Sequence, residues 1–289
     1  MSLVKPFIVV LALLLGACGP AEPLPVTAPP TNTNPPQRAA YYLGNAGVMV
    51  VDQQTKLLFD PLFGEGYNTY QLVPKPILTA IIAGTAPYDG IDVVFISHAH
   101  GDHFSAKPVL AYLQANPAVK LVAPQQAVDK LLAAGMSAQA IASRVIPINQ
   151  QTGDAPISVQ AGSIQVEAIT IPHSGGERFK AVRNTVYRVE MAENLRVLHL
   201  GDATIENAPF AGQQAFWDRQ NNDLVFTPYW LFKDAARRKN LDAHVRPIRA
   251  IGVHVPTALS NLKKRYGTAL DDVDLFTRPG EVRDLQAAK

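Results

Sequence analysis

The sequence contains a single cysteine, Cys18. An internal disulfide needs two thiols, so this chain is not one of the exported proteins whose folds are held together by disulfide bridges. The chain is also poor in charge, with 17% charged residues and a formal net charge of +2. A nucleic-acid-binding domain normally carries clustered lysine and arginine, and this balance does not indicate one. The length of 289 residues and the 47% hydrophobic content are typical of one large or two small globular domains.

Long hydrophobic runs are scarce as well, and the one at the start of the chain is short. Phe7 to Leu15 is uniformly apolar, too short to span a bilayer comfortably. Lys5 precedes it and the small residues Gly16-Ala17 follow it, as in a secretory signal. The sequence LGAC, ending at Cys18, resembles a bacterial lipoprotein signal. That resemblance implies cleavage before the cysteine and a lipid on its thiol; the alternative is an ordinary signal peptide with an incidental cysteine.

These features predict a lipoprotein signal peptide over residues 1–17 and an exported protein anchored to a bacterial membrane through lipidated Cys18. Gly19 follows the cysteine where an aspartate would favour inner-membrane retention, so we expect the periplasmic side of the outer membrane if the source has one. Residues 18–40 are expected to form a proline-rich tether. Its extended polyproline geometry would reach up to ~60 Å.

The pattern from residue 41 to 289 predicts one α/β domain. Strands are expected at 41–52, 56–63, 91–97, 119–124, 156–160, 163–171, 184–191, 195–202, 222–230 and 249–256, with helices at 107–115 and 125–135. Strands come in runs that helices interrupt. This order indicates layered sheets with helices on the outside.

The stretch FISHAHGDHFS, Phe95–Ser105, holds three of the seven histidines in the chain. His98 and His100 follow a buried strand, and extended backbone places alternate side chains on one side, roughly 6–7 Å apart. Gly101 lets the chain turn and aim the following Asp-His pair elsewhere. Nitrogen and carboxylate ligands without thiolate predict a catalytic metal site in preference to a structural one. The ligand type alone does not choose between zinc and iron.

The segment from His98 to His103 has the form H-x-H-x-D-H and resembles the signature of the metallo-β-lactamase superfamily. That pattern also expects a histidine, an aspartate and a last histidine, each at the end of a strand. His173 in ITIPHSGG, Asp202 in VLHLGDA and His254 in AIGVHVP occur in this order. The resemblance implies that His98, His100 and His173 hold one metal, that Asp102, His103 and His254 hold a second, and that Asp202 bridges both.

The resemblance further implies a four-layered αββα sandwich with the site at the sheet edges. The cofactors would be two divalent metal ions, zinc first, with iron or manganese as alternatives. A zinc ion lowers the pKa of bound water to about 7, which makes hydroxide available at neutral pH. We therefore expect a metallo-hydrolase that uses a metal-bridging hydroxide oriented by Asp102 and Asp202.

The first strands narrow the substrate class. YYLGNAGVMVV and KLLFDPLF resemble the branch that contains ascorbate-6-phosphate lactonases and N-acyl phosphatidylethanolamine phospholipase D. The branch carries Gly-His-Ala where this chain has Asn45, whereas Asp60-Pro61 matches it. Asp60 either supports the metal ligands or only forms a turn. The resemblance implies hydrolysis of an ester-type bond, a phosphodiester or a lactone, in an anionic small-molecule or lipid substrate.

Several residues near the expected site have open roles. Basic residues follow two of the expected site strands. The first set is Arg178, Lys180 and Arg183, and the second is Arg237, Arg238 and Lys239. The aromatic residues Tyr229, Trp230 and Phe232 precede the second set. The basic residues either recognise an anion or belong to solvated loops, and the aromatic residues either line a pocket or pack in the core. His199 is expected to pack inside a strand or to support a ligand from behind, and His244 to lie on the surface, with lining of a substrate pocket as its alternative.

Three other functions remain open at this point. A membrane-tethered protein with these ligands would bind or sense metal without turnover. A true β-lactamase would cleave a β-lactam instead of an ester. A redox di-iron protein would usually carry glutamate at the position of His100.

Overall fold

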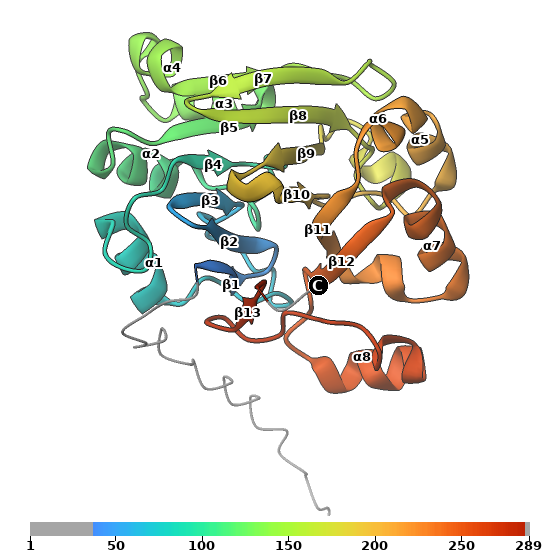
Figure 1. The fold of residues 1–289 in the computed structure, drawn as a ribbon. Helices are drawn as coiled ribbons and strands as arrows, with labels where there is room; N and C mark the ends of the chain where they lie inside the picture. Colours follow the sequence, from blue (N-terminus) through green and yellow to red (C-terminus); the bar gives the residue numbers. More distant parts are fainter. Residues whose placement is uncertain (1–36, 287–289) are drawn as a thin grey trace, which may run out of the picture.

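The computed structural model describes residues 37–286 of the chain (Figure 1). The predicted signal peptide, Cys18 and nearly all of the predicted tether lie outside the described residues. Within the described part, no helix combines the length and apolar character needed to cross a bilayer.

The first sheet contains seven strands in the order β13-β1-β2-β3-β4-β5-β6. Their bounds are β1 Arg38–Gly44, β2 Gly47–Asp52, β3 Thr55–Phe59, β4 Val93–Phe95, β5 Lys120–Pro124, β6 Val145–Ile148 and β13 Val282–Asp284. The pairs from β13 to β3 are antiparallel, and those from β3 to β6 are parallel. The carboxyl ends of β3 and β4 therefore meet at one edge of the sheet.

The second sheet contains six strands in the order β12-β11-β10-β9-β8-β7. Their bounds are β7 Ile157–Ala161, β8 Ile164–Thr170, β9 Thr185–Glu190, β10 Arg196–His199, β11 Asn222–Pro228 and β12 Pro247–Val253. Strands β10, β11 and β12 run parallel, and the pairs from β7 to β10 are antiparallel. Strands β8, β10 and β12 consequently point the same way, so the segments that follow them share one edge.

Helices cover the outer face of each sheet, giving four layers (Figure 1). The α-helices are α1 Lys75–Ala83, α2 Ala106–Ala115, α3 Gln125–Ala133, α4 Ala138–Arg144, α5 Asn207–Ala211, α6 Gln214–Arg219, α7 Ala235–Asn240 and α8 Leu259–Tyr266. Shorter helical segments are η1 Gly176–Phe179, η2 Ala192–Asn194, η3 Tyr229–Phe232, η4 Leu241–Val245 and η5 Gly267–Leu270, of which η4 is a π-helix. The αββα sandwich expected from the sequence is confirmed.

The strand pattern explains why the layers hold together. In β1, Ala39, Tyr41 and Leu43 pack with helices α1 to α3, whereas Ala40 and Tyr42 face the second sheet. Successive strand residues point to opposite faces, so an unbroken apolar strand supplies two cores at once. This is the sequence pattern of a sheet that is covered on both sides.

Two strands were not expected from the sequence, β6 and β13. Strand β6 contains Pro147 and lies at the edge of its sheet, where a missing backbone N–H is tolerated. Strand β13 has three residues and pairs only with β1. Tyr229 and Trp230 were expected within a strand, but β11 ends at Pro228 and they begin η3.

A buried ion pair ties the second sheet to helix α6. The Nε of Arg188 in β9 donates to Glu167 Oε2 in β8 over 2.7 Å, and the guanidinium lies 4.0 Å from the centre of the Phe216 ring. Arg188 is 2% exposed. Burial lowers the pKa of Arg188, and the adjacent Glu167 opposes that shift.

We predict that Glu167→Ala destabilises the protein strongly, because it leaves a buried guanidinium without its carboxylate. Breaking such a pair from one side costs about 3–5 kcal/mol of the free energy of unfolding. Urea denaturation followed by circular dichroism measures the loss. Glu177→Ala is the matched control, because Glu177 pairs with Lys180 at the exposed surface, where ion pairs contribute little. Equal stability of the two variants would contradict the prediction.

Candidate metal centre

The predicted ligands all lie at the carboxyl ends of strands. His98 follows β4, His173 follows β8, Asp202 follows β10 and His254 follows β12. The loop after β4 contacts the segment that contains Glu65 and Tyr67. A Cβ at Gly101 would lie 2.7 Å from Glu65 Cγ, so a larger residue would require the exposed Glu65 side chain to move. The two sheets therefore bring residues from distant parts of the sequence to one edge.

The structure brings the seven predicted residues together in overlapping groups. Ligand atoms lie within 4.8 Å of one another in His98–His100–His173, in His98–His103–Asp202 and in Asp102–His103–His254. The first and third groups are the two sets that the resemblance implied. Six of the seven side chains are buried, and His100 is half-buried.

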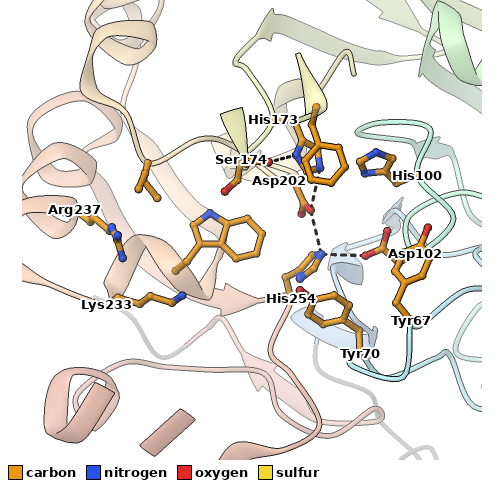
Figure 2. Close-up of a pocket in the computed structure, with 14 residues that line it drawn as sticks. Tyr67, Tyr70, His100, Asp102, His173, Ser174, Asp202, Lys233, Arg237 and His254 are labelled. Atoms are coloured by element: carbon orange, nitrogen blue, oxygen red, sulfur yellow. Dashed lines mark hydrogen bonds and ion pairs between the residues drawn. The ribbon is translucent and has the colours of Figure 1, made fainter. Parts of the chain in front are cut away.

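Asp202 lies between the two groups. Its Oδ1 is 3.2 Å from His103 Nε2, and its Oδ2 is 3.3 Å from His173 Nε2 and 3.2 Å from His254 Nε2. His254 Nε2 also lies 3.3 Å from Asp102 Oδ2, and Figure 2 shows this histidine between the two carboxylates. One carboxylate thus touches histidines of both groups, which is the position that a bridging ligand requires.

The donor atoms of this cluster fit divalent metal ions. Nitrogen atoms Nε2 of His103, His173 and His254 and Oδ1 of Asp202 are buried and have no hydrogen-bond partner among the described residues. A buried polar atom without a partner is costly, and most such atoms in native proteins are satisfied. Imidazole nitrogen with carboxylate oxygen suits zinc, and equally iron or manganese. The residues present therefore fit the metals that the sequence predicted.

Asp60 holds His103 in place from behind. Its Oδ2 accepts hydrogen bonds from His103 Nδ1 at 2.7 Å and Ser97 Oγ at 2.6 Å, and its Oδ1 accepts one from Ser97 N at 2.7 Å. A donor at Nδ1 leaves Nε2 facing the centre, the usual carboxylate–histidine arrangement behind a metal. Of the two roles open from the sequence, Asp60 therefore supports the site.

Asn45 performs a similar task for Asp102. Its Nδ2 donates to the backbone oxygen of Asp102 at 2.9 Å and to Oδ2 at 3.3 Å. Its own backbone oxygen accepts from His254 N at 2.8 Å. The residue that departs from the branch pattern is thus in contact with the centre, as a hydrogen-bond donor to a carboxylate.

The sequence reasoning missed Asn184. Its Oδ1 accepts from Asp202 N at 2.9 Å, and its Nδ2 donates to the backbone oxygens of Ile171 and Leu200. Gly201 has a φ of +54°, and a Cβ there would lie 2.2 Å from Asn184 Oδ1. The Gly-Asp pair was visible in the sequence, but nothing near residue 184 signalled the contact.

The two remaining histidines differ from one another. His199 packs against Phe59 with ring centroids 5.2 Å apart, and its Nε2 bonds the backbone oxygen of Ala46, as expected of an interior residue. His244 was expected on the surface, and that expectation was wrong. It is 9% exposed, because η4 seats it between Gln214 Oε1 and Asn207 Oδ1, each 2.8 Å away.

Opposite charges set the protonation of the metal-free cluster. Burial disfavours charge on His103, but Asp202, Asp102 and Asp60 raise its pKa well above the usual value. Burial is likewise outweighed at His254, whose pKa Asp202 and Asp102 raise. Burial disfavours the charged form of Asp202, yet His254 and His103 hold its pKa well below the usual range. The carboxylate of Asp202 is therefore ionised at neutral pH, and both histidines keep their protons to higher pH than a free imidazole does.

A pocket of about 390 Å³ opens from the centre. Aromatic side chains form much of its wall: Tyr67, Tyr70, Phe179 and Trp230. Phe179 packs against His100 and His173, with centroids 5.0 and 4.8 Å apart. Of the basic residues noted in the sequence, Arg237 lines this pocket and Lys233, not singled out there, joins it. Figure 2 shows both on the side away from His100.

We predict that Asp60→Asn weakens metal binding about 10–100-fold, the usual effect of losing a partner behind a metal-binding histidine. The amide cannot replace the carboxylate as acceptor for both His103 and Ser97. Calorimetric titration of metal-free protein with zinc measures the change. Asp92→Asn serves as control, since Asp92 bonds the backbone of Lys56 away from the centre. Unchanged zinc affinity in Asp60→Asn would contradict the role given to it.

We also predict that metal binding releases protons. A metal needs neutral imidazole, whereas the raised pKa values let His103 and His254 keep their protons to higher pH in the metal-free protein than a free imidazole would. Zinc affinity should therefore fall as the pH is lowered. It should increase with rising pH and become constant once the pH exceeds these pKa values. Titrations in two buffers of different ionisation enthalpy measure the protons released. No net release at pH 7 would show that the histidines are already neutral.

Comparison with known proteins agrees with this geometry. A family profile described as "Beta-lactamase superfamily domain" matches residues 55–258, which is most of the chain. No match was found among curated proteins.

Solved structures share the fold at low sequence identity. Igni18, a metallo hydrolase from the hyperthermophilic archaeon Ignicoccus hospitalis, is 15% identical and has a TM-score of 0.54, covering 85% of this chain and 97% of its own. A possible metal-dependent hydrolase from Veillonella parvula is 14% identical with a TM-score of 0.58, covering 87% and 100%. CmlA, a diiron beta-hydroxylase from Streptomyces venezuelae, is 16% identical with a TM-score of 0.52, covering 86% and 54%.

The prediction of a metallo-hydrolase is confirmed at the level of family and fold. The roles of the individual ligands and the number and identity of the metals stay predictions. From the family profile and the αββα fold, this chain belongs to the beta-lactamase superfamily.

Proposed function

We propose that this protein is a di-metal hydrolase, with zinc as the first candidate metal, which cleaves an ester-type bond in an anionic substrate. The observation that carries the proposal is Asp202, whose two oxygens contact histidines of both ligand groups at 3.2 to 3.3 Å. His98, His100 and His173 would hold one ion, and Asp102, His103 and His254 the other, with Asp202 shared. Bound divalent metals lower the pKa of water enough to supply hydroxide at neutral pH.

The chain's own residues contribute position and charge. His103, His254 and Asn45 hold the two carboxylates in fixed orientations. The charge of the histidines keeps the pKa of Asp202 low, so this carboxylate accepts hydrogen bonds and does not donate them. Asp102, whose pKa is also lowered, behaves in the same way. Both carboxylates are therefore suited to orienting the attacking water, and neither to protonating the leaving group.

The ester specificity rests on the resemblance of the first strands to the lactonase and phospholipase branch, and on the cationic residues of the pocket. The match of Asp60 to that branch is supported by its place behind His103. A phosphodiester or a lactone is the proposed bond, in a small molecule or a lipid. The proposal includes export and anchoring through Cys18, which rest on the N-terminal sequence alone.

The proposal is tested on the full chain by elemental analysis together with a panel of chromogenic substrates. The panel contains a phosphodiester, a phosphomonoester, a lactone, a thioester and nitrocefin. We expect about two zinc ions per chain, as a shared carboxylate requires, and chelator-sensitive hydrolysis of bis-para-nitrophenyl phosphate or the lactone. Metal binding without any turnover would favour a binding or sensing role. Activity on nitrocefin alone would identify a β-lactamase, and iron with visible absorbance a redox site.

We predict that Asp202→Asn lowers kcat/KM by about 100-fold or more, because losing a shared ligand should exceed the 10–100-fold effect of losing a residue behind one. The same variant should bind less metal than the wild type. Asp218→Asn is the control, since Asp218 forms an exposed ion pair with Arg246. Full activity and full metal content in Asp202→Asn would overturn the bridging role.

A further inference from the structure

The pocket beside the metal centre is uneven in charge. Among the described residues that line it, the acids are Asp102 and Asp202, and both contact histidines of the centre. Lys233 and Arg237 line the other side, and neither belongs to the ligand groups (Figure 2). No lining acid neutralises these two cations, so this side of the pocket favours an anion.

Lys233 has no anionic partner within residues 37–286. Its Nζ lies 4.7 Å from the ring centre of Tyr229 and 4.4 Å from that of Tyr266. Two aromatic rings hold an ammonium in place and partly exclude water without neutralising it. The charge of Lys233 is therefore fixed in position and available to a ligand.

The guanidinium of Arg237 is paired with a carboxylate on one side, at Nε. Asp234 caps helix α7 by accepting from Arg237 N at 2.9 Å, and its other oxygen lies 3.3 Å from Arg237 Nε. The terminal nitrogens of this guanidinium have no partner among the described residues. In the next residue, Arg238, both terminal nitrogens are bound to Asp272. Arg237 thus keeps free the fork that binds carboxylate or phosphate in a bidentate manner.

Trp230 connects the two halves of the pocket. Its ring lies edge-on to His254 with centroids 5.0 Å apart, and its Nε1 donates to the backbone oxygen of Ala203 at 3.0 Å. It belongs to η3, directly before Lys233 in the sequence. The indole is therefore fixed, and it offers an apolar surface that leads from the centre towards the cations.

We infer that Lys233 and Arg237 form a specificity subsite for a second anionic group of the substrate, remote from the bond that is cleaved. This group is a carboxylate or a phosphate, and the part of the substrate between it and the reacting bond lies on Trp230. The inference rests on the proposed function for the location of that bond. It narrows the substrate class to esters or lactones that carry their own oxyanion on an apolar spacer.

The test uses the full chain loaded with zinc and measures binding by calorimetry. The probes are succinate, glutarate and adipate, each beside its monomethyl ester, with 3-phosphonopropionate as the phosphate-like probe. Every probe keeps one carboxylate for the metal centre, so the diacid differs from its ester only in the second charge. Three lengths cover the spacing between the centre and the subsite.

At the best length we expect the diacid to bind about tenfold more tightly than its ester, which corresponds to about 1.4 kcal/mol. Lys233→Met and Arg237→Gln should each remove most of that difference while the ester binds as before. Lys239→Gln is the control, since this exposed lysine lies on the same helix outside the pocket. A larger loss for the phosphonate than for the dicarboxylate in Arg237→Gln would identify phosphate as the group recognised.

A diacid preference that persists in both variants, or no preference at any length, would overturn the subsite. Lys233→Arg keeps the charge and should retain part of the preference, which separates loss of recognition from loss of folding. Hydrolysis by the wild type is followed in parallel. Turnover of neutral and charged esters at equal rates would contradict the subsite alone. Charge-dependent binding without any turnover would contradict the hydrolase proposal alone.

Discussion

The predicted metal centre depends on the carboxylate of Asp60, which is almost completely buried. It directly follows β3, and it accepts hydrogen bonds from the backbone and hydroxyl of Ser97 and from the ring of His103. These bonds join the ends of two adjacent parallel strands to one imidazole. Asn45 and Asn184 act in the same way on the two aspartates of the centre. The predicted ligands are therefore oriented by buried polar groups that are themselves bonded to backbone atoms, an arrangement that packing alone would not produce.

The same burial makes the cluster expensive to maintain. Burial disfavours charge on Asp102 and Asp202, and positive charge on His103 and His254 favours the ionised form of both carboxylates. Divalent ions would supply that positive charge and would free the imidazole protons. The stability of the fold and the occupancy of the centre are therefore coupled. A protein of this design should be more resistant to unfolding with metal than without it.

The sequence predicted most of the fold and the seven residues that the structure brings together, because both depend on local sequence patterns. The segment His98–His103 is contiguous, and His254 lies at the end of an apolar run that predicts a strand without reference to other parts of the chain. Asn184 was missed because its contact with the centre arises only when β8, β9 and β10 assemble. His244 was misplaced because η4 turns it inward against two other helices. The sequence left the role of Arg237 open, because only the fold shows that the guanidinium of its neighbour Arg238 is paired with Asp272, a carboxylate from a distant segment.

Strand β1 has a consequence for handling the protein. It begins at Arg38 and runs to Gly44, and the next residue, Asn45, touches the metal centre. A seven-residue strand places its two ends roughly 20 Å apart. Whatever is joined ahead of Arg38 enters at the end of this strand that points away from the pocket. An affinity tag, a fluorophore or a bead surface attached there is therefore joined to the described domain at a point roughly 20 Å from the end of the strand that meets the centre.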